Sequence, residues 1–155
     1  MLSKKELLIM SYFRKNARLN LTKISRDTGV PVSTIYDKLK KYEGSVIKKH
    51  TALVDFQKLG YELRVNVLLK SSNSTKAELC SFLLKFPNIN SLLRINNGFD
   101  FLAEGIFRNM AEVQSFYEKL EKFNIQQIQE FFIIEDIKRE SFLSDPDLLN
   151  IVGSA

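Results

Sequence analysis

The chain has 155 residues, of which 45% are hydrophobic and 26% charged, so it can form one domain or two small ones and is not disordered by composition. Its single cysteine excludes a disulfide framework and fits a reducing cytoplasm. No apolar run approaches the roughly 20 residues of a membrane span, and the N-terminus does not read as a signal peptide, so we expect a cytoplasmic protein with no membrane partner.

The net charge of +5 is unevenly distributed along the chain. Residues 1–60 contain 13 Lys and Arg against 5 Asp and Glu, a charge of +8, whereas residues 61–155 contain 10 against 13, a charge of −3. This asymmetry is expected when only the front part touches a polyanion. It favours nucleic-acid binding by the N-terminal part over a chance clustering of solubilising lysines.

The first two predicted helices carry local start and stop signals. Residues 2–16 begin with Ser3 and Glu6 at the spacing of a capping box. The apolar surface of this helix is wider than one stripe, so either a partner subunit or the rest of the same chain must cover it. Asn20 is a favourable N-cap for a helix over 21–28, and Gly29 is placed to end it.

Residues 31–42 predict a third helix, with Pro31 in its first turn. Helical spacing places Val32, Ile35, Leu39 and Tyr42 on one buried stripe. Together with the helix 21–28 and a short turn, this is the spacing of a helix-turn-helix. The opposite face suits a DNA major groove, although a solvated lysine face is the ordinary alternative. The predicted DNA contacts on this helix are Ser33, Thr34, Tyr36, Asp37, Lys38, Lys40 and Lys41.

Two short extended segments follow the third helix. Residues 46–48 and 51–54 predict a small hairpin, or wing, with Lys48 and Lys49 at its tip. We expect these lysines to hold DNA phosphates, together with Asn20 and Thr22 at a helix N-terminus. The alternative is a solvated turn.

Three stretches carry a resemblance to a known family: Asn16-Ala-Arg-Leu-Asn20, Val32-Ser-Thr-Ile35, and the run from Val46-Ile-Lys48 through Thr51-Ala-Leu-Val-Asp55 to Lys58-Leu-Gly60. On these, residues 2–60 resemble the DNA-binding domain of the Lrp/AsnC (leucine-responsive, feast/famine) transcription regulators. The sequence departs from the family at Asp37, where a basic residue is usual. A carboxylate repels phosphate but accepts from a cytosine amino group, so Asp37 is expected to alter which bases are read.

The C-terminal half predicts a ferredoxin-like unit after a linker over 55–61. Alternation and helical periodicity predict a strand, a helix, two strands about an Asn-Gly turn, a helix and a last strand, over 62–70, 76–86, 89–95, 99–107, 111–123 and 125–138. The expected fold class is therefore α+β, an N-terminal winged helix-turn-helix domain followed by a ferredoxin-like βαββαβ domain. The expected boundaries are 1–54 for DNA binding, 55–61 for the linker, 62–140 for dimerisation and effector binding, and 141–155 for a tail that is either docked or frayed.

The last predicted strand is apolar on both faces. Ile128, Phe132 and Ile134 share one parity, and Phe131, Ile133 and Ile137 share the other. A sheet with one bare face does not tolerate this, so a second subunit is the expected cover. The resemblance also implies a homodimer or higher homo-oligomer, which would hold two DNA-binding domains at a fixed spacing on double-stranded DNA.

The turn between the middle strands is the candidate effector site. The resemblance implies a small-molecule effector, often an amino acid, near a Gly-x-x-Asp motif at this turn, and here Gly98 and Asp100 stand one residue closer than usual. Asp100 is the candidate for an amino group, and the backbone of Asn97 and Gly98 the candidate for a carboxylate. An unliganded turn is the alternative.

The sequence carries no pattern typical of catalysis or metal binding. His50 is the only histidine, Cys80 is expected to serve in packing, and zinc spacing and phosphate-binding loops are absent from the sequence. We therefore expect no enzyme, no cofactor and no metal site. The predicted function is a sequence-specific DNA-binding transcription regulator, with an architectural DNA-coating protein of little sequence preference and no effector as the alternative.

Overall fold

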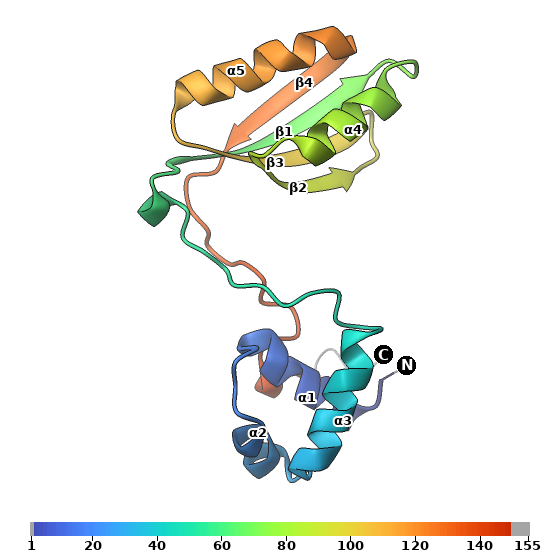
Figure 1. Cartoon of the computed structure of the whole chain (residues 1–155), viewed down its shortest axis with the longest axis vertical. Coiled ribbons are helices and arrows are strands. Elements are labelled where there is room, and N and C mark those ends of the chain that lie inside the picture. The colour runs from blue at the N-terminus through green and yellow to red at the C-terminus, as the bar shows by residue number, and fades with distance from the viewer. Residues whose placement is uncertain (1, 150–155) are drawn as a thin grey trace. The chain divides into compact units, whose positions relative to one another are not determined.

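The computed structural model describes residues 2–149. Within them the chain forms two compact units, shown in Figure 1. One unit comprises the described residues up to Ala52 together with those from Ile137 onward, and the other comprises Leu53–Asp136. In this range no helix combines the length and apolar character needed to cross a membrane.

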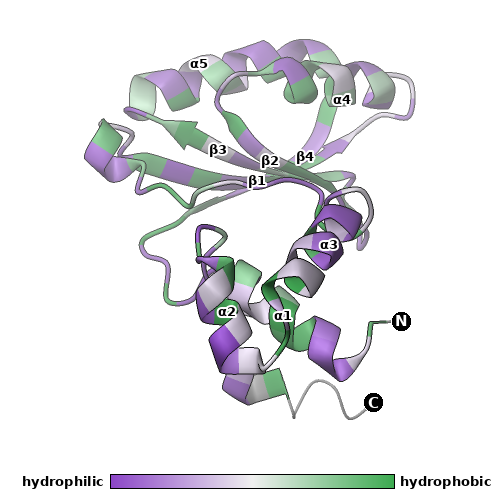
Figure 2. Cartoon of the chain, turned by 60° about the horizontal axis from the view of Figure 1, so that its bottom comes forward, coloured by the Kyte–Doolittle hydropathy of each residue, from purple (hydrophilic) through white to green (hydrophobic). Residues whose placement is uncertain are grey.

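Three helices and a short C-terminal turn form the first unit. They are α1 (Lys4–Lys15), α2 (Leu21–Thr28), α3 (Val32–Glu43) and the 3-10 turn η3 (Pro146–Leu148). In Figure 2 the ribbons of α1, α2 and α3 each carry both hydrophilic and hydrophobic residues. Their inward sides meet in a cluster of buried residues, Ile9, Phe13, Ile24 and Ile35.

The predicted caps of the first two helices are confirmed. Ser3 and Glu6 form the capping box of α1, with the Ser3 amide donating to Glu6 Oε2 at 2.8 Å. The Asn20 side chain accepts from the Thr22 amide at 2.9 Å, which satisfies a free N–H in the first turn of α2. Gly29 ends α2 at φ 68°, a left-handed conformation that a side chain would disfavour.

The C-terminal segment docks on α1 of the same chain. The Arg14 guanidinium donates to the Glu140 carboxylate at 3.2 Å and to the Phe142 carbonyl at 3.1 Å. Arg14 lies in the last turn of α1, so these contacts fasten the segment to the outer side of that helix. Of the tail predicted for 141–155, residues 141–149 thus dock on the first unit, whereas 150–155 lie outside the described residues.

The predicted wing is wrong. Residues 46–54, all of them described, contain no strand, and the backbone N–H groups of Val46 and Ile47 instead donate to the Tyr42 carbonyl at 2.9 and 2.8 Å. These bonds extend the end of α3 and draw the first half of the predicted hairpin away from strand pairing. A two-stranded ribbon without further packing is only marginally stable, so β-favouring residues alone do not form one here.

The second unit is a four-stranded antiparallel sheet with two helices on one face (Figure 1). Its elements are η1 (Gln57–Leu59), β1 (Leu63–Ser71), α4 (Lys76–Lys85), β2 (Ile89–Arg94), β3 (Phe101–Phe107), α5 (Met110–Leu120), η2 (Glu121–Phe123) and β4 (Ile125–Phe132). The strand order is β2-β3-β1-β4, so the predicted ferredoxin-like arrangement is confirmed.

Alternation along β1 separates the two faces of this sheet. Val65, Val67 and Leu69 are buried against α4 and α5, in a core that also contains Phe107 and Phe116. The rings of Phe107 and Phe116 lie 5.7 Å apart in a tilted arrangement. The residues between the three buried positions of β1 therefore face away from the helices.

The last strand is shorter than predicted. β4 ends at Phe132 instead of residue 138, because its pairing partner β1 begins at Leu63 and the last bond along this edge joins the Ile133 amide to the Arg64 carbonyl at 2.8 Å. Ile134 and Ile137 are thus outside the sheet, and each is 91% exposed. They do not add to either face.

Candidate nucleic-acid interface

The orientation of α3 is set by two buried side chains. Ile35 is fully buried, Tyr42 is 2% exposed, and Leu39 between them is half-buried. Val32, predicted for the same stripe, is 41% exposed, because it lies in the first turn beyond the reach of the cluster. The opposite side of the helix is open to solvent, and the exposed predicted contacts on it are Ser33, Thr34, Tyr36, Asp37, Lys40 and Lys41.

Lys38 is placed apart from these residues. Its ammonium pairs with Glu6 of α1 at 2.8 Å, on the side of α3 that carries Tyr42. The Lys38 hydrogen bond, followed by the bonds from Ser3, lowers the pKa of Glu6 from 4.5 to about 2. Burial and the neighbouring Glu6 raise the pKa of Tyr42 to about 12. Lys38 and Glu6 stand 32 positions apart, so sequence spacing did not reveal this support for α3.

Tyr36 and Lys40 form a pair on the exposed side of α3. The Lys40 ammonium lies 4.7 Å from the centre of the Tyr36 ring, one helical turn away. The interaction with Tyr36 raises the pKa of Lys40. The pair presents an aromatic ring and a fixed cation next to Asp37.

The remaining predicted contacts lie on other segments of the same unit. Thr22 is exposed in the first turn of α2, whereas the Asn20 side chain is engaged in the cap. Lys48 and Lys49 are exposed, in the segment that does not form a wing. Lys48 and Lys49 therefore lie in a segment without strand structure after α3 instead of at a hairpin tip.

The predicted effector residues are only partly brought together. Asn97 and Gly98 are exposed at the turn, with φ of 62° and 90°. The Asp100 carboxylate accepts from the Ser71 amide at 3.0 Å and pairs with the Lys76 ammonium at 2.6 Å. Desolvation raises the pKa of Asp100, but the bonds from Lys76 and Ser71 outweigh it and leave the pKa below its ordinary value. Asp100 thus ties β3 to the end of β1 and the start of α4.

His50 and Cys80, the residues with potential metal or nucleophilic chemistry, make ordinary structural contacts. His50 Nε2 lies 3.1 Å from Glu43 Oε1 at the surface, and Cys80 packs against the core below the sheet. Across residues 2–149 no group of three or more His, Cys, Asp and Glu could hold a metal ion.

The helix-free face of the sheet combines a charged network with apolar side chains. Arg64 donates to Asp136 Oδ2 at 2.7 Å and lies 3.3 Å from Glu104 Oε1. Glu104 also accepts from Asn90 at 2.7 Å and is only 8% exposed. By the strand register, the apolar residues that share this face are Leu68, Leu93, Leu102, Ile106 and Phe131. Phe131 and Leu93 remain 52% and 55% exposed.

A family model, a curated relative and solved structures all match this chain. The pattern of the Lrp/AsnC ligand binding domain matches residues 65–143. The HTH-type transcriptional regulator FL11 of Pyrococcus furiosus is 31% identical over 111 residues, which cover 71% of this chain and 74% of that protein.

Solved structures share the fold. The transcriptional regulator NMB0573 of Neisseria meningitidis, solved as an L-Met complex, superposes with a TM-score of 0.82 at 19% identity, covering 90% of this chain and 94% of that one. LrpC of B. subtilis superposes with a TM-score of 0.80 at 22% identity, covering 89% and 98%. With the match to the ligand binding domain and the identity to FL11, these likenesses show that the chain belongs to the Lrp/AsnC family of transcription regulators.

Proposed function

We propose that this protein is a cytoplasmic, sequence-specific DNA-binding regulator of transcription that acts as a dimer or higher oligomer. The observation that carries the proposal is the outward face of α3. Two short hydroxyl side chains, a carboxylate, a tyrosine and two lysines are exposed on a helix whose other side is held by Ile35 and Tyr42. Such a helix can enter a major groove and reach base edges.

The exposed residues of the first unit divide into two roles. Ser33, Thr34 and Asp37 lie early on α3 and would meet base edges, with Asp37 able to accept from a cytosine amino group. Lys40, held by Tyr36, and Lys41 would lie nearby. Lys48, Lys49 and the N-terminus of α2 with Thr22 would hold phosphates, which position a protein on DNA without reading sequence. Lys38 would support α3 through Glu6 instead of contacting DNA.

Selection from random duplex DNA followed by fluorescence anisotropy tests this proposal. The selected duplex should bind far more tightly than a random one, and Asp37→Asn should change the preferred base at one position of each half-site by roughly 1–3 kcal/mol of discrimination. Lys49→Ala should reduce the slope of log affinity against log salt by about one unit if it holds a phosphate. Lys85→Ala, an exposed lysine on α4, is the matched control.

Two results would contradict the proposal. A specificity ratio near one would favour an architectural protein that coats DNA, and no affinity in dilute salt would remove DNA binding altogether. An unchanged salt slope for Lys49→Ala would remove only the role of the segment after α3.

We propose the helix-free face of the sheet as the dimer interface. Phe131 and Leu93 are half exposed there around the Arg64 network, and an exposed apolar surface of this kind commonly marks a protein contact. Phe131→Lys should shift sedimentation from dimer towards monomer, whereas Leu84→Lys, 70% exposed on α4, should not. A wild-type monomer at micromolar concentration would exclude this interface.

A small effector at the turn of Asn97 and Gly98 completes the proposal. The L-Met complex of the Neisseria relative and the match to a ligand binding domain support an amino acid as the class of ligand. Because the Asp100 carboxylate already binds Lys76 and the Ser71 amide, the backbone of the turn would make the first contacts with the ligand. Titration with L-methionine should shift the amide resonances of Asn97 and Gly98. Unmoved resonances across a panel of amino acids would reject this site.

A further inference from the structure

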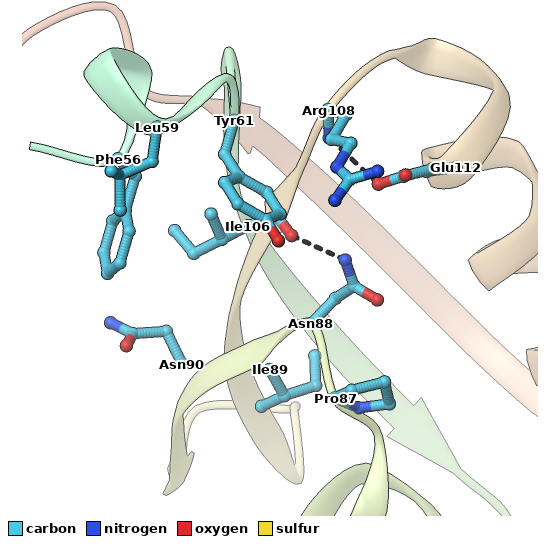
Figure 3. A pocket seen from close by; sticks show the side chains of 10 residues that line it. All are labelled: Phe56, Leu59, Tyr61, Pro87, Asn88, Ile89, Asn90, Ile106, Arg108 and Glu112. Carbon is cyan, nitrogen blue, oxygen red and sulfur yellow. Dashed lines mark hydrogen bonds between the residues drawn. The ribbon is translucent and has the colours of Figure 1, made fainter.

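A cavity lies at the opposite end of β2 and β3 from the Asn97 turn. It has a volume of about 540 Å³, within the range of small-molecule sites. Its walls come from four segments, namely residues 56–61 around η1, residues 87–90 at the start of β2, residues 106–108 at the end of β3, and the first turn of α5 (Figure 3). All of them belong to the unit Leu53–Asp136.

One side of the cavity is polar. The exposed Arg108 guanidinium lies 5.2 Å from the centre of the Tyr61 ring, and Figure 3 shows it beside Tyr61 and Glu112. A guanidinium has five N–H donors, and one phenol oxygen cannot satisfy them all. The Glu112 carboxylate accepts the Arg108 backbone amide at 2.9 Å, which holds the two residues together at the start of α5. Arg108 is thus a positioned cation at the rim.

The other side of the cavity is apolar. Phe56 and Leu59 of the η1 region face Ile89 and Ile106 across it, as Figure 3 shows. Leu59 is 62% exposed, whereas Ile106 at the base is 7% exposed. Asn88 stands between the two sides, where its side-chain Nδ2 donates to the Ile106 carbonyl at 2.8 Å, and its side-chain Oδ1 is a further acceptor.

We propose that this cavity binds a small carboxylate with an apolar body. The planar fork of Arg108 matches a carboxylate bidentately, and the body would lie on Phe56, Leu59 and Ile89. The carboxylate and the apolar body are common to an amino acid and a simple carboxylic acid. An amino group on the ligand would in addition meet the Glu112 carboxylate or the side-chain Oδ1 of Asn88. The site does not depend on DNA binding and is separate from the Asn97 turn.

Three probes with the same apolar body separate the contribution of the carboxylate to binding from that of the amino group. Full-length protein with isotope-labelled isoleucine methyl groups is titrated with 4-methylpentanoate, L-leucine and the uncharged 4-methylpentanamide, without DNA. Ile89 and Ile106 should shift with the two carboxylates, and Ile128 on β4 should not. The amide should bind at least about tenfold more weakly. Tighter binding of L-leucine than of 4-methylpentanoate identifies an amino acid, and the reverse identifies a simple acid.

Substitution of the cation gives the decisive comparison. Arg108→Gln should lower the affinity for 4-methylpentanoate about 10- to 100-fold, and Arg108→Lys should retain only part of the wild-type affinity. Arg94→Gln, an exposed arginine at the other end of β2, is the matched control, and the isoleucine spectrum in the absence of ligand reports that each variant is folded. Equal affinities for Arg108→Gln and wild type, or methyl groups that do not move at millimolar concentrations, would overturn the proposal. So would shifts confined to Ile95, the isoleucine beside the Asn97 turn.

Discussion

The two units of this protein reach stability by different means. Under the sheet, 11 buried residues form one cluster with several paired aromatic rings, whereas the described part of the helical unit has a cluster of 4. The helical unit adds a capping box, the Lys38–Glu6 pair and the clasp of Arg14 on the C-terminal segment. A small core leaves little margin of stability, so the unit proposed to meet DNA also depends on these polar contacts, two of which join distant parts of the chain.

Because of this difference, removal of one buried side chain should destabilise the helical unit more completely than the sheet unit. In the sheet unit, loss of one side chain leaves a large apolar cluster. In the helical unit, each buried side chain is a substantial part of the whole core.

Ile35→Ala should cause the largest loss. Removal of a fully buried isoleucine costs about 2–5 kcal/mol, which is comparable to the stability of a small helical domain. Region-resolved hydrogen exchange should show rapid exchange in α1, α2 and α3 while β1 and β3 stay protected. DNA binding should be lost with the helices.

The matched substitution in the other unit is Phe116→Ala. It should speed exchange in the sheet and leave α1–α3 unchanged, because Phe116 belongs to the core below the sheet. If either variant lowers protection equally in both units, the two units unfold together and the comparison fails.

Gly105→Ala should destabilise the sheet unit by about 1–3 kcal/mol. A Cβ at residue 105 would lie 2.4 Å from the buried Phe107 ring, which shares its face of β3. Urea unfolding should show the loss, and Phe107→Leu in the same chain should relieve part of it. Purely additive effects in this double-mutant cycle would show that the ring is not the obstacle.

Arg14→Gln should lower the stability of the helical unit by about 1 kcal/mol or less, because the pair with Glu140 is largely exposed. Exchange should rise in residues 137–147 more than in α2. Arg18→Gln, also exposed, provides the control. Unchanged exchange in the C-terminal segment would mean that the segment is not held by Arg14.

Glu6→Gln tests the charge of the Lys38 pair separately from the cap, because glutamine also completes a capping box. The pKa of Glu6 falls from 4.5 to about 2 on folding, so its charge stabilises the folded unit fully above pH 4.5. That contribution is lost as the pH falls from 4.5 to about 2. The difference in unfolding free energy between wild type and Glu6→Gln should therefore shrink over this interval. A difference that does not change with pH would exclude the ion pair as its source.

Local chemistry explains the features that sequence analysis identified. The Ser3–Glu6 box, the Asn20 cap and the left-handed Gly29 each involve residues within four positions of one another. The Asn97-Gly98 turn and the alternation in β1 are equally local. The strand order β2-β3-β1-β4 followed because the succession of strands and helices is compatible with few topologies.

The errors arose where a local pattern needed a partner. Residues 46–54 favour extended structure, but no neighbouring strand pairs with them, and Tyr42 captures the first N–H groups. The apolar pattern after Ile125 predicts a strand to residue 138, but β4 ends at Phe132 because β1, its partner, begins at Leu63. A strand continues only as far as another strand supplies its hydrogen bonds.

From the sequence alone one obtains the helix-turn-helix, the split sheet unit, the basic front half and the residues on the outer side of α3. Periodicity, capping and charge are properties of neighbouring residues, so they can be read before the chain is folded. Only the tertiary structure turns Lys38 towards Glu6, engages Asp100 with Lys76, docks the C-terminal segment on Arg14 and assembles a cavity around Arg108. Each of these joins residues far apart in the chain, and such pairings are decided by how the elements pack.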